Sequence, residues 1–408
     1  MSVVVIGTLD TKGDEVAFAR DLLVSLGFKT IVVDAGSAGV PSFRGDVPRD
    51  EVFRRAGTSL AEIEALGDRA AGVERSARGV AAFVGELAER GELEGVLGLG
   101  GSAGTTIATA AMRPLPFGLP KIVVSTLASG QTRPFIEGAD VVLFPAVADI
   151  AGLNRITRKV IANAVAALAG MIEHNNNLND IHNFNQFNDR AVIAATMFGV
   201  TTSCVDRARR GLEERGFEPI VFHATGVGGR AMERLILEGG ISGVLDLTTT
   251  ELADELAGGI LSAGPDRLEA AGRRGIPQVV GPGALDMVNF GPRSTVPDRF
   301  RDRLFHVHNT NVTLMRTTIE ENAELGRRIA SILSRAKAAA AVILPLKGIS
   351  ALDAPGSPFF DPEADSALFD AIETGLKGSP NVRVIKLDLH INDPQFADAS
   401  VNELINML

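Results

Sequence analysis

Gly95-Val96-Leu97-Gly98-Leu99-Gly100-Gly101-Ser102-Ala103-Gly104-Thr105-Thr106 is the stretch that decides the fold. It begins as a short apolar strand, breaks into a glycine-rich loop and continues as a helix. Glycines at such a turn allow positive φ angles and let a ligand approach the backbone closely. The free N–H groups and the dipole of a helix start favour an anion. The stretch therefore predicts a phosphate-binding turn, and the alternative is a tight turn without a ligand.

Two known phosphate-binding motifs do not fit this stretch. Gly98-x-Gly100-x-x-Ala103 matches the loose dinucleotide pattern, but the acidic residue expected about 20 residues later is missing. The strand expected there ends in Ser125-Thr126. No lysine follows Gly104, so the stretch is not a P-loop. The sequence disfavours NAD and leaves a phosphate site of another kind.

The whole chain has the composition of a soluble protein with two or three domains: 408 residues, 45% of them hydrophobic and 22% charged. A net charge of −10 argues against nucleic-acid binding, which needs a basic surface. The longest apolar runs are too short for a membrane span, so no membrane partner is expected. The single cysteine, Cys204, excludes an internal disulfide and favours a buried structural role. We expect a cytoplasmic protein without a signal peptide.

Strands and helices alternate through the first half of the chain. Residues 3–7 and 30–34 read as buried strands, and helical periodicity follows at 14–26, 76–90 and 155–172. Residues 40–75 are charged and less periodic, which suggests an excursion over the surface. This alternation predicts an α/β fold with a doubly wound parallel sheet, and we place the first domain at residues 1–173.

Five loops of this half should all meet at one edge of the sheet: residues 8–13, 35–39, 100–106, 125–132 and 148–154. Ligands of doubly wound sheets bind outside the carboxyl ends of the strands, where these loops lie. Lys12 is the best candidate for a phosphate-binding cation, and Asp10 is a candidate ligand for Mg²⁺, which prefers a carboxylate together with phosphates and waters. A solvated lysine and a plain helix cap are the alternatives for these two residues. The predicted binding residues are Thr8, Asp10, Thr11, Lys12, Gly36, Gly100, Gly101, Ser102, Ala103, Gly104 and Thr105.

Residues 174–190 are Asn-rich and aperiodic, and we interpret them as a linker in which His174 and His182 are solvated. The pattern of the first half then starts again. Residues 26–33 correspond to residues 215–222 at a shift of 189 positions, and residues 94–97 correspond to 242–245. We therefore predict a duplicated Rossmann-like unit, with a second domain and an extended tail at residues 191–408, and a ligand cleft between the two domains.

The loops of the two halves differ. The second half lacks the triple-glycine turn and should bind a different ligand or none. Its substrate-binding candidates are Thr201, Thr202, Thr248, Thr249, His306 and His308, the last two placed on one face of a strand by its period of two. The turn at residues 225–230 could bind an anion or serve only packing. The carboxylates Asp361, Glu363 and Asp365 suggest a metal or substrate loop, with an acidic helix cap as the alternative, and residues 350–360 are a candidate lid.

Four motifs in order, at residues 7–12, 100–105, 195–201 and 357–365, resemble the ATP-binding-domain family related to the N-terminal half of the tomato mosaic virus resistance protein. The resemblance covers nearly the whole chain. It implies two Rossmann-like domains, ATP bound mainly by the first, and a homodimer. It supplies no catalytic residue, so the catalytic residues stay unassigned.

Together these observations predict a cytoplasmic Mg-ATP-binding protein that uses ATP on a small metabolite in the interdomain cleft. A nucleotide-sensing dimeric module without turnover is the alternative. A nucleotide-independent lyase or hydrolase that uses the second half is a third. The substrate and the reaction do not follow from the sequence.

Overall fold

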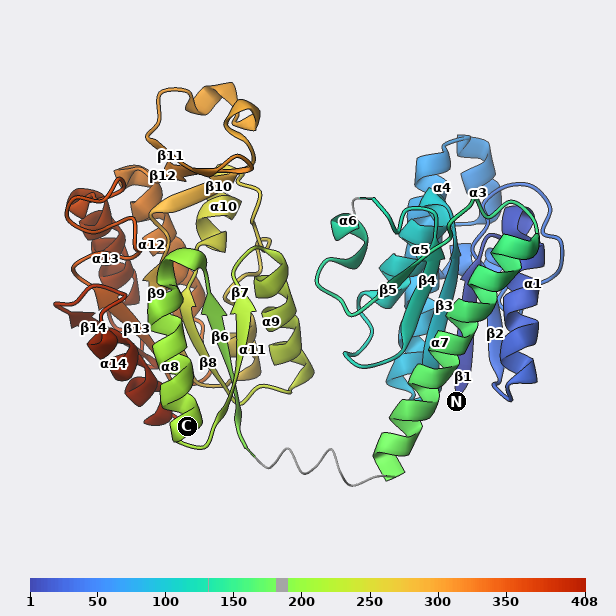
Figure 1. Cartoon of the computed structure of the whole chain (residues 1–408), viewed down its shortest axis with the longest axis horizontal. Helices are drawn as coiled ribbons and strands as arrows, with labels where there is room; N and C mark the ends of the chain where they lie inside the picture. Colours follow the sequence, from blue (N-terminus) through green and yellow to red (C-terminus); the bar gives the residue numbers. More distant parts are fainter. Residues whose placement is uncertain (131, 181–189) are drawn as a thin grey trace. The chain divides into compact units, whose positions relative to one another are not determined.

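Two units, Met1–Phe187 and Asn188–Leu408, make up the computed structural model of the chain, which describes residues 1–130, 132–180 and 190–408 (Figure 1). Each unit is built around its own parallel sheet. His182 and the rest of residues 181–189 lie outside the described residues. The α/β fold class predicted from the sequence is confirmed.

The sheet of the first unit is wholly parallel and has the order β2-β1-β3-β4-β5. Its strands are continuous apolar runs because helices cover both faces. Its strand bounds are β1 Ser2–Gly7, β2 Thr30–Asp34, β3 Leu93–Gly100, β4 Lys121–Ser125 and β5 Val142–Pro145.

Two pairs of helices cover this sheet. α1 (Leu9–Ser25) and α7 (Arg155–Asp180) pack on one face, and α4 (Arg69–Glu89) and α5 (Ser102–Met112) pack on the other. α7 runs beyond the predicted end at residue 172, so His174 lies in the helix, where it is exposed. The excursion at residues 40–75 contains α2 (Arg49–Arg55), α3 (Leu60–Leu66) and the start of α4, while α6 (Arg133–Ile136) follows β4.

The second unit repeats this topology with one more strand. Its parallel sheet has the order β7-β6-β8-β9-β13-β14, so β6, β7, β8 and β9 stand in the order of β1, β2, β3 and β4. The bounds are β6 Val192–Met197, β7 Glu218–His223, β8 Gly243–Thr248, β9 Gln278–Gly283, β13 Ala340–Pro345 and β14 Val382–Leu387. The predicted duplication is therefore visible in the strand order.

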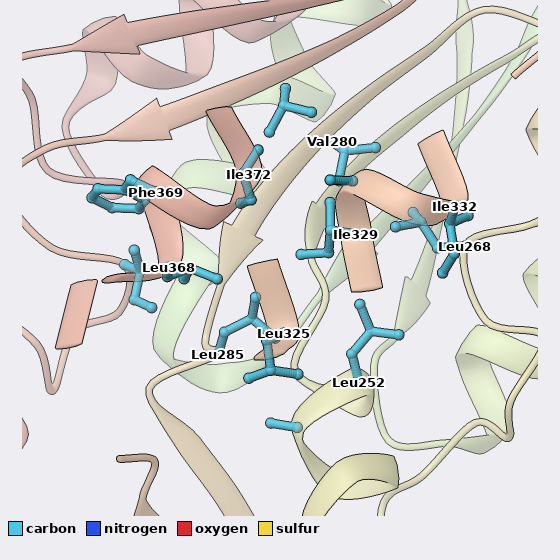
Figure 2. Close-up of a cluster of buried hydrophobic side chains, with 14 of the residues drawn as sticks. Leu252, Leu268, Val280, Leu285, Leu325, Ile329, Ile332, Leu368, Phe369 and Ile372 are labelled. Atoms are coloured by element: carbon cyan, nitrogen blue, oxygen red, sulfur yellow. The ribbon is translucent and has the colours of Figure 1, made fainter. Parts of the chain in front are cut away.

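Helices also cover both faces of this second sheet. α8 (Thr202–Glu214) and α14 (Pro394–Ile405) share one face, and Cys204 is buried there as predicted. The opposite face carries α9 (Val227–Glu238) and α11 (Ala270–Arg274) beside the largest hydrophobic cluster of the unit. In that cluster, side chains of α10 (Glu251–Ala257), α12 (Ile319–Leu333) and α13 (Pro362–Leu376) meet on the sheet (Figure 2).

A separate antiparallel sheet of three strands is inserted between β9 and β13. Its order is β10-β12-β11, with β10 Met287–Phe290, β11 Phe305–Asn309 and β12 Val312–Arg316. The first unit has no counterpart of this sheet among its described residues. Within the described ranges, no helix is both long and apolar enough to cross a membrane.

Candidate functional site

A cavity of about 710 Å³ lies where the strand order of the first unit reverses, at the carboxyl ends of β1 and β3. In a sheet of this order the loops after β1 and β3 leave in opposite directions, and ligands bind in the crevice between them. The cavity has the size of a small-molecule site. Of the residues predicted from the sequence, it is lined by Thr8, Asp10, Thr11, Lys12, Gly101, Ser102, Ala103 and Gly104.

The start of α5 forms one wall of the cavity. Gly101 is the N-cap and gives the helix no side-chain acceptor. Thr105 N–H donates to the Gly101 carbonyl at 2.9 Å, whereas the N–H groups at the start of a helix have no partner within the helix. Ser102, Ala103 and Gly104, all in this first turn, line the cavity. The predicted anion cradle is thus a surface of the cavity.

The glycines serve close packing rather than left-handed backbone, so the predicted positive φ angles are wrong. Gly101 has φ −77°, and neither Gly100 nor Gly104 has a positive φ. A Cβ on Gly100 would stand 2.7 Å from Gly104 Cα, and a Cβ on Gly104 would stand 2.9 Å from the Leu99 carbonyl oxygen. A Cβ on Gly101 would meet only Thr126 Oγ1, at 3.7 Å. Gly100 and Gly104 therefore let helix and strand approach, while Gly101 leaves the cavity open.

A second helix start, that of α1, faces the same cavity. Thr8 is its N-cap without a side-chain hydrogen bond to the helix, and Thr8 Oγ1 lies 2.7 Å from Thr11 Oγ1. Lys12 has φ −131° and interrupts the helical geometry. Its ammonium donates to the Ile150 carbonyl in the loop after β5. Lys12 is therefore oriented at the site by the backbone, although it is only half buried.

Asp10 has a buried carboxylate oxygen, Oδ1, without a hydrogen-bond partner among the described residues. Behind it, Asp34 at the end of β2 accepts from Leu9 N–H at 3.1 Å, Gly36 N–H at 3.0 Å and Arg49 Nε at 2.8 Å. A Cβ on Gly36 would stand 3.0 Å from Asp10 Oδ1. Gly36 thus makes room for Asp10 and does not line the cavity itself.

Asp10 Oδ1, which is buried and unpartnered, could hold a Mg²⁺ ion. The described residues contain no cluster of three or more His, Cys, Asp or Glu side chains arranged for a metal. A cation at Asp10 would therefore complete its coordination with phosphate oxygens and waters, as Mg²⁺ commonly does.

Gly100 and Thr105 lie beneath the cavity. Thr105 is fully buried, and its Oγ1 is 2.6 Å from Ser125 Oγ at the end of β4. This hydrogen bond joins α5 to the neighbouring strand. Thr105 therefore supports the helix start that carries the cradle.

Sequence reasoning missed the outer wall of the cavity, which comes from the residues read as a surface excursion. α3 contributes Ile63 and Glu64, and the start of α4 contributes Asp68, Arg69 and Val73. The capping signals Ser59-x-x-Glu62 and Asp68 were the available clues, since both side chains cap helices here. Further lining comes from Ala35, Ser37, Ala38, Gly39, Gly67, Ile107 and Asp149.

The loop after β5 closes another side of the cavity. It is fixed by Lys12 and by buried Glu15, whose carboxylate accepts from Gly152 N–H at 2.6 Å. Val147 in this loop has φ 66°, a rare conformation for a β-branched residue, and its side chain is 81% exposed. The loop therefore holds backbone strain close to Asp149, which lines the cavity.

In the second unit, the predicted threonines are tied to one another. Thr201 Oγ1 lies 2.7 Å from Thr248 Oγ1, and Thr249 Oγ1 donates to the Gly281 carbonyl at 3.0 Å. All three are fully buried, and Thr202 is half buried. These hydroxyls brace the carboxyl ends of β6 and β8.

In this unit a carboxylate of the protein itself binds the glycine turn after β7, the strand that stands in the place of β2. Glu251 Oε1 accepts from Gly226 N–H at 2.6 Å and from Gly229 N–H at 3.1 Å, at the start of α9. Its other oxygen accepts from Arg267, which also pairs with Asp246. Glu251 and Arg267 are almost completely buried. The glycine turn at residues 225–230 is thus filled from within the chain.

His306 and His308 lie on β11, the edge strand of the antiparallel sheet. A register shift between Val307 and Asn309 interrupts the period of two on which the shared face was predicted. His306 is half buried and packs edge-on against Phe359 with ring centroids 6.3 Å apart, while His308 is exposed.

The Asp361–Asp365 segment starts a helix. Asp361 is the N-cap of α13 and accepts from Ala364 N–H at 3.1 Å. Asp365 pairs with Arg316 at 3.0 Å, and burial together with the nearby Asp353 carboxylate raises the pKa of Asp365 to about 9. Burial, with Asp353 a smaller cause, also raises the pKa of Asp286 to about 7.

The candidate lid at residues 350–360 is anchored at several points. Ala351 N–H donates to the Val200 carbonyl at 3.0 Å, and Phe359, fully buried, accepts from Arg316 Nε at its carbonyl. Ser350 Oγ donates to Asp286 at 2.7 Å. This segment is a packed part of the second unit.

The amino-acid sequence of the chain is similar to those of several known proteins. The chain is 47% identical over 406 residues to a UPF0261 protein of Clostridium tetani, covering 100% of this chain and 98% of that protein. It is 41% identical over 425 residues to the ToMV resistance protein Tm-1(GCR237) of Solanum lycopersicum, covering 98% of this chain and 55% of that protein.

A likeness to a solved structure is weak. The chain is 14% identical to a putative UDP-N-acetylglucosamine 2-epimerase from Listeria monocytogenes, with a TM-score of 0.20, over 93% of this chain and 97% of that chain. This score supports no argument about fold or function. By contrast, residues 1–177 match the N-terminal domain and residues 190–408 the C-terminal domain of the uncharacterised protein family UPF0261. The chain therefore belongs to the UPF0261 family.

Proposed function

We propose that the cavity of the first unit binds a Mg²⁺-bound nucleoside triphosphate, with ATP as the ligand implied by the resemblance seen in the sequence. One observation carries the proposal: two helix starts, of α1 and α5, face one cavity at the strand reversal. The start of α5 contributes N–H groups and the positive end of a helix dipole, the arrangement that phosphate groups use. The start of α1 contributes the Thr8 and Thr11 hydroxyls, because its own N–H groups already donate to Asp34 and to the Thr8 carbonyl. Lys12, which also lines the cavity, adds a full positive charge.

The rest of the cavity suits the remaining parts of such a ligand. Asp10 offers its unpartnered oxygen to the cation. Ile63, Val73 and Ile107 give apolar surface for a base, and Glu64 offers a carboxylate for sugar hydroxyls.

We propose an enzyme that uses this nucleotide on a small metabolite, in the cytoplasm and as a homodimer. The substrate-binding role of the second unit and the ligand cleft between the domains stay predictions. The alternative is a dimeric nucleotide sensor without turnover. It is favoured by the second unit, where Thr201 and Thr248 bond each other and Glu251 fills the glycine turn after β7, so these groups are not free to bind a substrate.

Calorimetric titration with ATP, with and without Mg²⁺, tests the binding. We expect one ATP per chain and tighter binding with Mg²⁺. Release of ADP, AMP or phosphate is then followed while metabolites are added. Metabolite-dependent release supports the enzyme, and tight binding without release supports the sensor. If no nucleoside triphosphate binds at millimolar concentration, the proposed ligand is wrong. Sedimentation velocity tests the dimer.

A further inference from the structure

A second cavity, of about 790 Å³, lies between α4 and α5 on the first unit. It adjoins the first cavity, because Arg69, Val73, Ser102 and Ala103 line both. The nucleotide parts assigned above touch this groove only at Val73 and the first turn of α5. The mouth shared by the two cavities is the first turn of α5, so the groove begins at the proposed phosphate position.

Small side chains keep the groove open. Along α4 they recur every three or four residues, which places them on one face of the helix. Across the groove, α5 presents further short side chains, including the hydroxyl of Thr106. The residues of this floor are Ala70, Val73, Ala77, Ala81, Ala103, Thr106 and Ala110. The floor is therefore mostly apolar over the distance from Ala103 to Ala110, about 10 Å along the helix axis.

The charges around the groove are unevenly compensated. Arg78 pairs with Glu74 at 2.5 Å. Arg113 donates to the Pro134 carbonyl at 3.0 Å and lies 3.4 Å from Glu137. Arg69 has no hydrogen-bond or ion-pair partner in the part of the chain that the structure describes. An uncompensated positive charge thus stands at the end of the groove next to the start of α5.

We propose that this groove binds a linear aliphatic carboxylate of medium length. Its carboxylate lies between Arg69 and the first turn of α5, where a guanidinium and a helix dipole both favour an anion. Its methylene chain lies on the alanine floor, where burial of apolar surface adds affinity. A cationic head group is repelled at the same position. Because this carboxylate and the proposed phosphate share the first turn of α5, the aliphatic carboxylate binds in place of the nucleotide, and the proposal does not depend on which nucleotide the first cavity takes.

Octanoate, acetate and octylamine are the probes, each titrated into the full-length protein by calorimetry without nucleotide. Octanoate matches the length of the floor. We expect octanoate to bind, and acetate to bind more than about tenfold more weakly because it buries no chain. Octylamine should not bind, because its charge opposes Arg69. Absence of octanoate binding, or equal binding of octanoate and octylamine, overturns the proposal.

Two variants of neighbouring residues on α4 test the position. Ala81→Phe fills the groove, whereas Ala82→Phe adds the same side chain at an exposed position outside it. We expect Ala81→Phe to weaken octanoate binding more than tenfold and Ala82→Phe to leave it unchanged, both with wild-type thermal unfolding. Equal affinities in the two variants overturn the assignment.

Arg69→Gln tests the head group even if Ala81→Phe does not fold, because Arg69 is exposed and has no partner to lose. Loss of a charged hydrogen bond should weaken octanoate binding by about tenfold or more. Acetate affinity should fall by a similar factor, because both probes carry the same carboxylate. An octanoate affinity that is unchanged in Arg69→Gln refutes the role of Arg69.

Discussion

Substitution of Gly101 should separate ligand binding from stability. At φ −77° an L-residue is unstrained, and a Cβ would meet nothing closer than Thr126 Oγ1 at 3.7 Å. Replacing Gly by Ala at such a position stabilises by about 0.4–1 kcal/mol through the unfolded chain. Loss of a favourable N-cap residue costs a few tenths of a kcal/mol or somewhat more. The free energy of unfolding of Gly101→Ala should therefore change by less than about 0.5 kcal/mol.

Gly100→Ala is the matched comparison. Its Cβ would stand 2.7 Å from Gly104 Cα, which is backbone and cannot rotate away. Overpacking of this kind costs about 1–3 kcal/mol. Thermal and urea unfolding should therefore show a clear loss of stability for Gly100→Ala, and close to none for Gly101→Ala.

Nucleotide binding should follow a different order. The side chain of Gly101→Val projects into the cavity where we place phosphate, so calorimetry with Mg-ATP should show no binding to a folded protein. Gly101→Ala should bind more than about tenfold more weakly, a loss of at least 1.4 kcal/mol. If Gly101→Val binds ATP as wild type does, the anion site lies elsewhere. If Gly101→Ala loses as much stability as Gly100→Ala, the steric argument is wrong.

Three further predictions concern other parts of the chain. Lys12→Ala should weaken ATP binding about tenfold or more in calorimetry, because a charged partner of phosphate is lost, and equal affinities would remove Lys12 from the site. Changing His306 and His308 to Ala should leave ATP affinity and a stoichiometry of one per chain intact while abolishing any ATP-dependent turnover; a parallel loss of ATP affinity would mean that the second unit binds nucleotide too. The stability of the second unit should fall as pH rises from 5 to 9, because the folded pKa values of Asp365 (about 9) and Asp286 (about 7) lie above their unfolded values, so the folded state binds more protons over this range. The slope should approach about 1.4 kcal/mol per pH unit for each proton, and urea unfolding of Asp365→Asn should show a shallower slope than wild type.

The sheets were predictable because their central strands, such as β1, β3 and β4, are buried and read as apolar runs. The loops after β1 and β3 were predictable for a related reason, since glycines and short polar residues end those runs abruptly. The convergence of residues 8–12 and 101–104 on one cavity followed from the parallel order alone.

The outer wall was not predictable in the same way. α3 has only seven residues, too few for a clear helical period, and the polar start of α4 hid the first turns of a helix whose apolar face begins later. The sequence predicted the strand that carries His306 and His308 but not the antiparallel sheet that it joins, because the pairing of β12 with β10 and β11 leaves no local pattern in the sequence. Glu251 binds the N–H group of Gly226, which lies 25 residues earlier in the chain. A contact between residues so far apart leaves no local pattern in the sequence, so it could not be predicted.

Glu251 also has a consequence for how the two units respond to their surroundings. A ligand that binds only the folded state stabilises it according to its free concentration. In the second unit the carboxylate that binds the start of α9 belongs to Glu251 of the same chain. This contact therefore does not depend on the concentration of any ligand in solution. The melting of the first unit should rise with nucleotide concentration, whereas that of the second should not. Under the proposed function, two units of the same fold would differ in this respect: the first would respond to a metabolite pool, and the second would not.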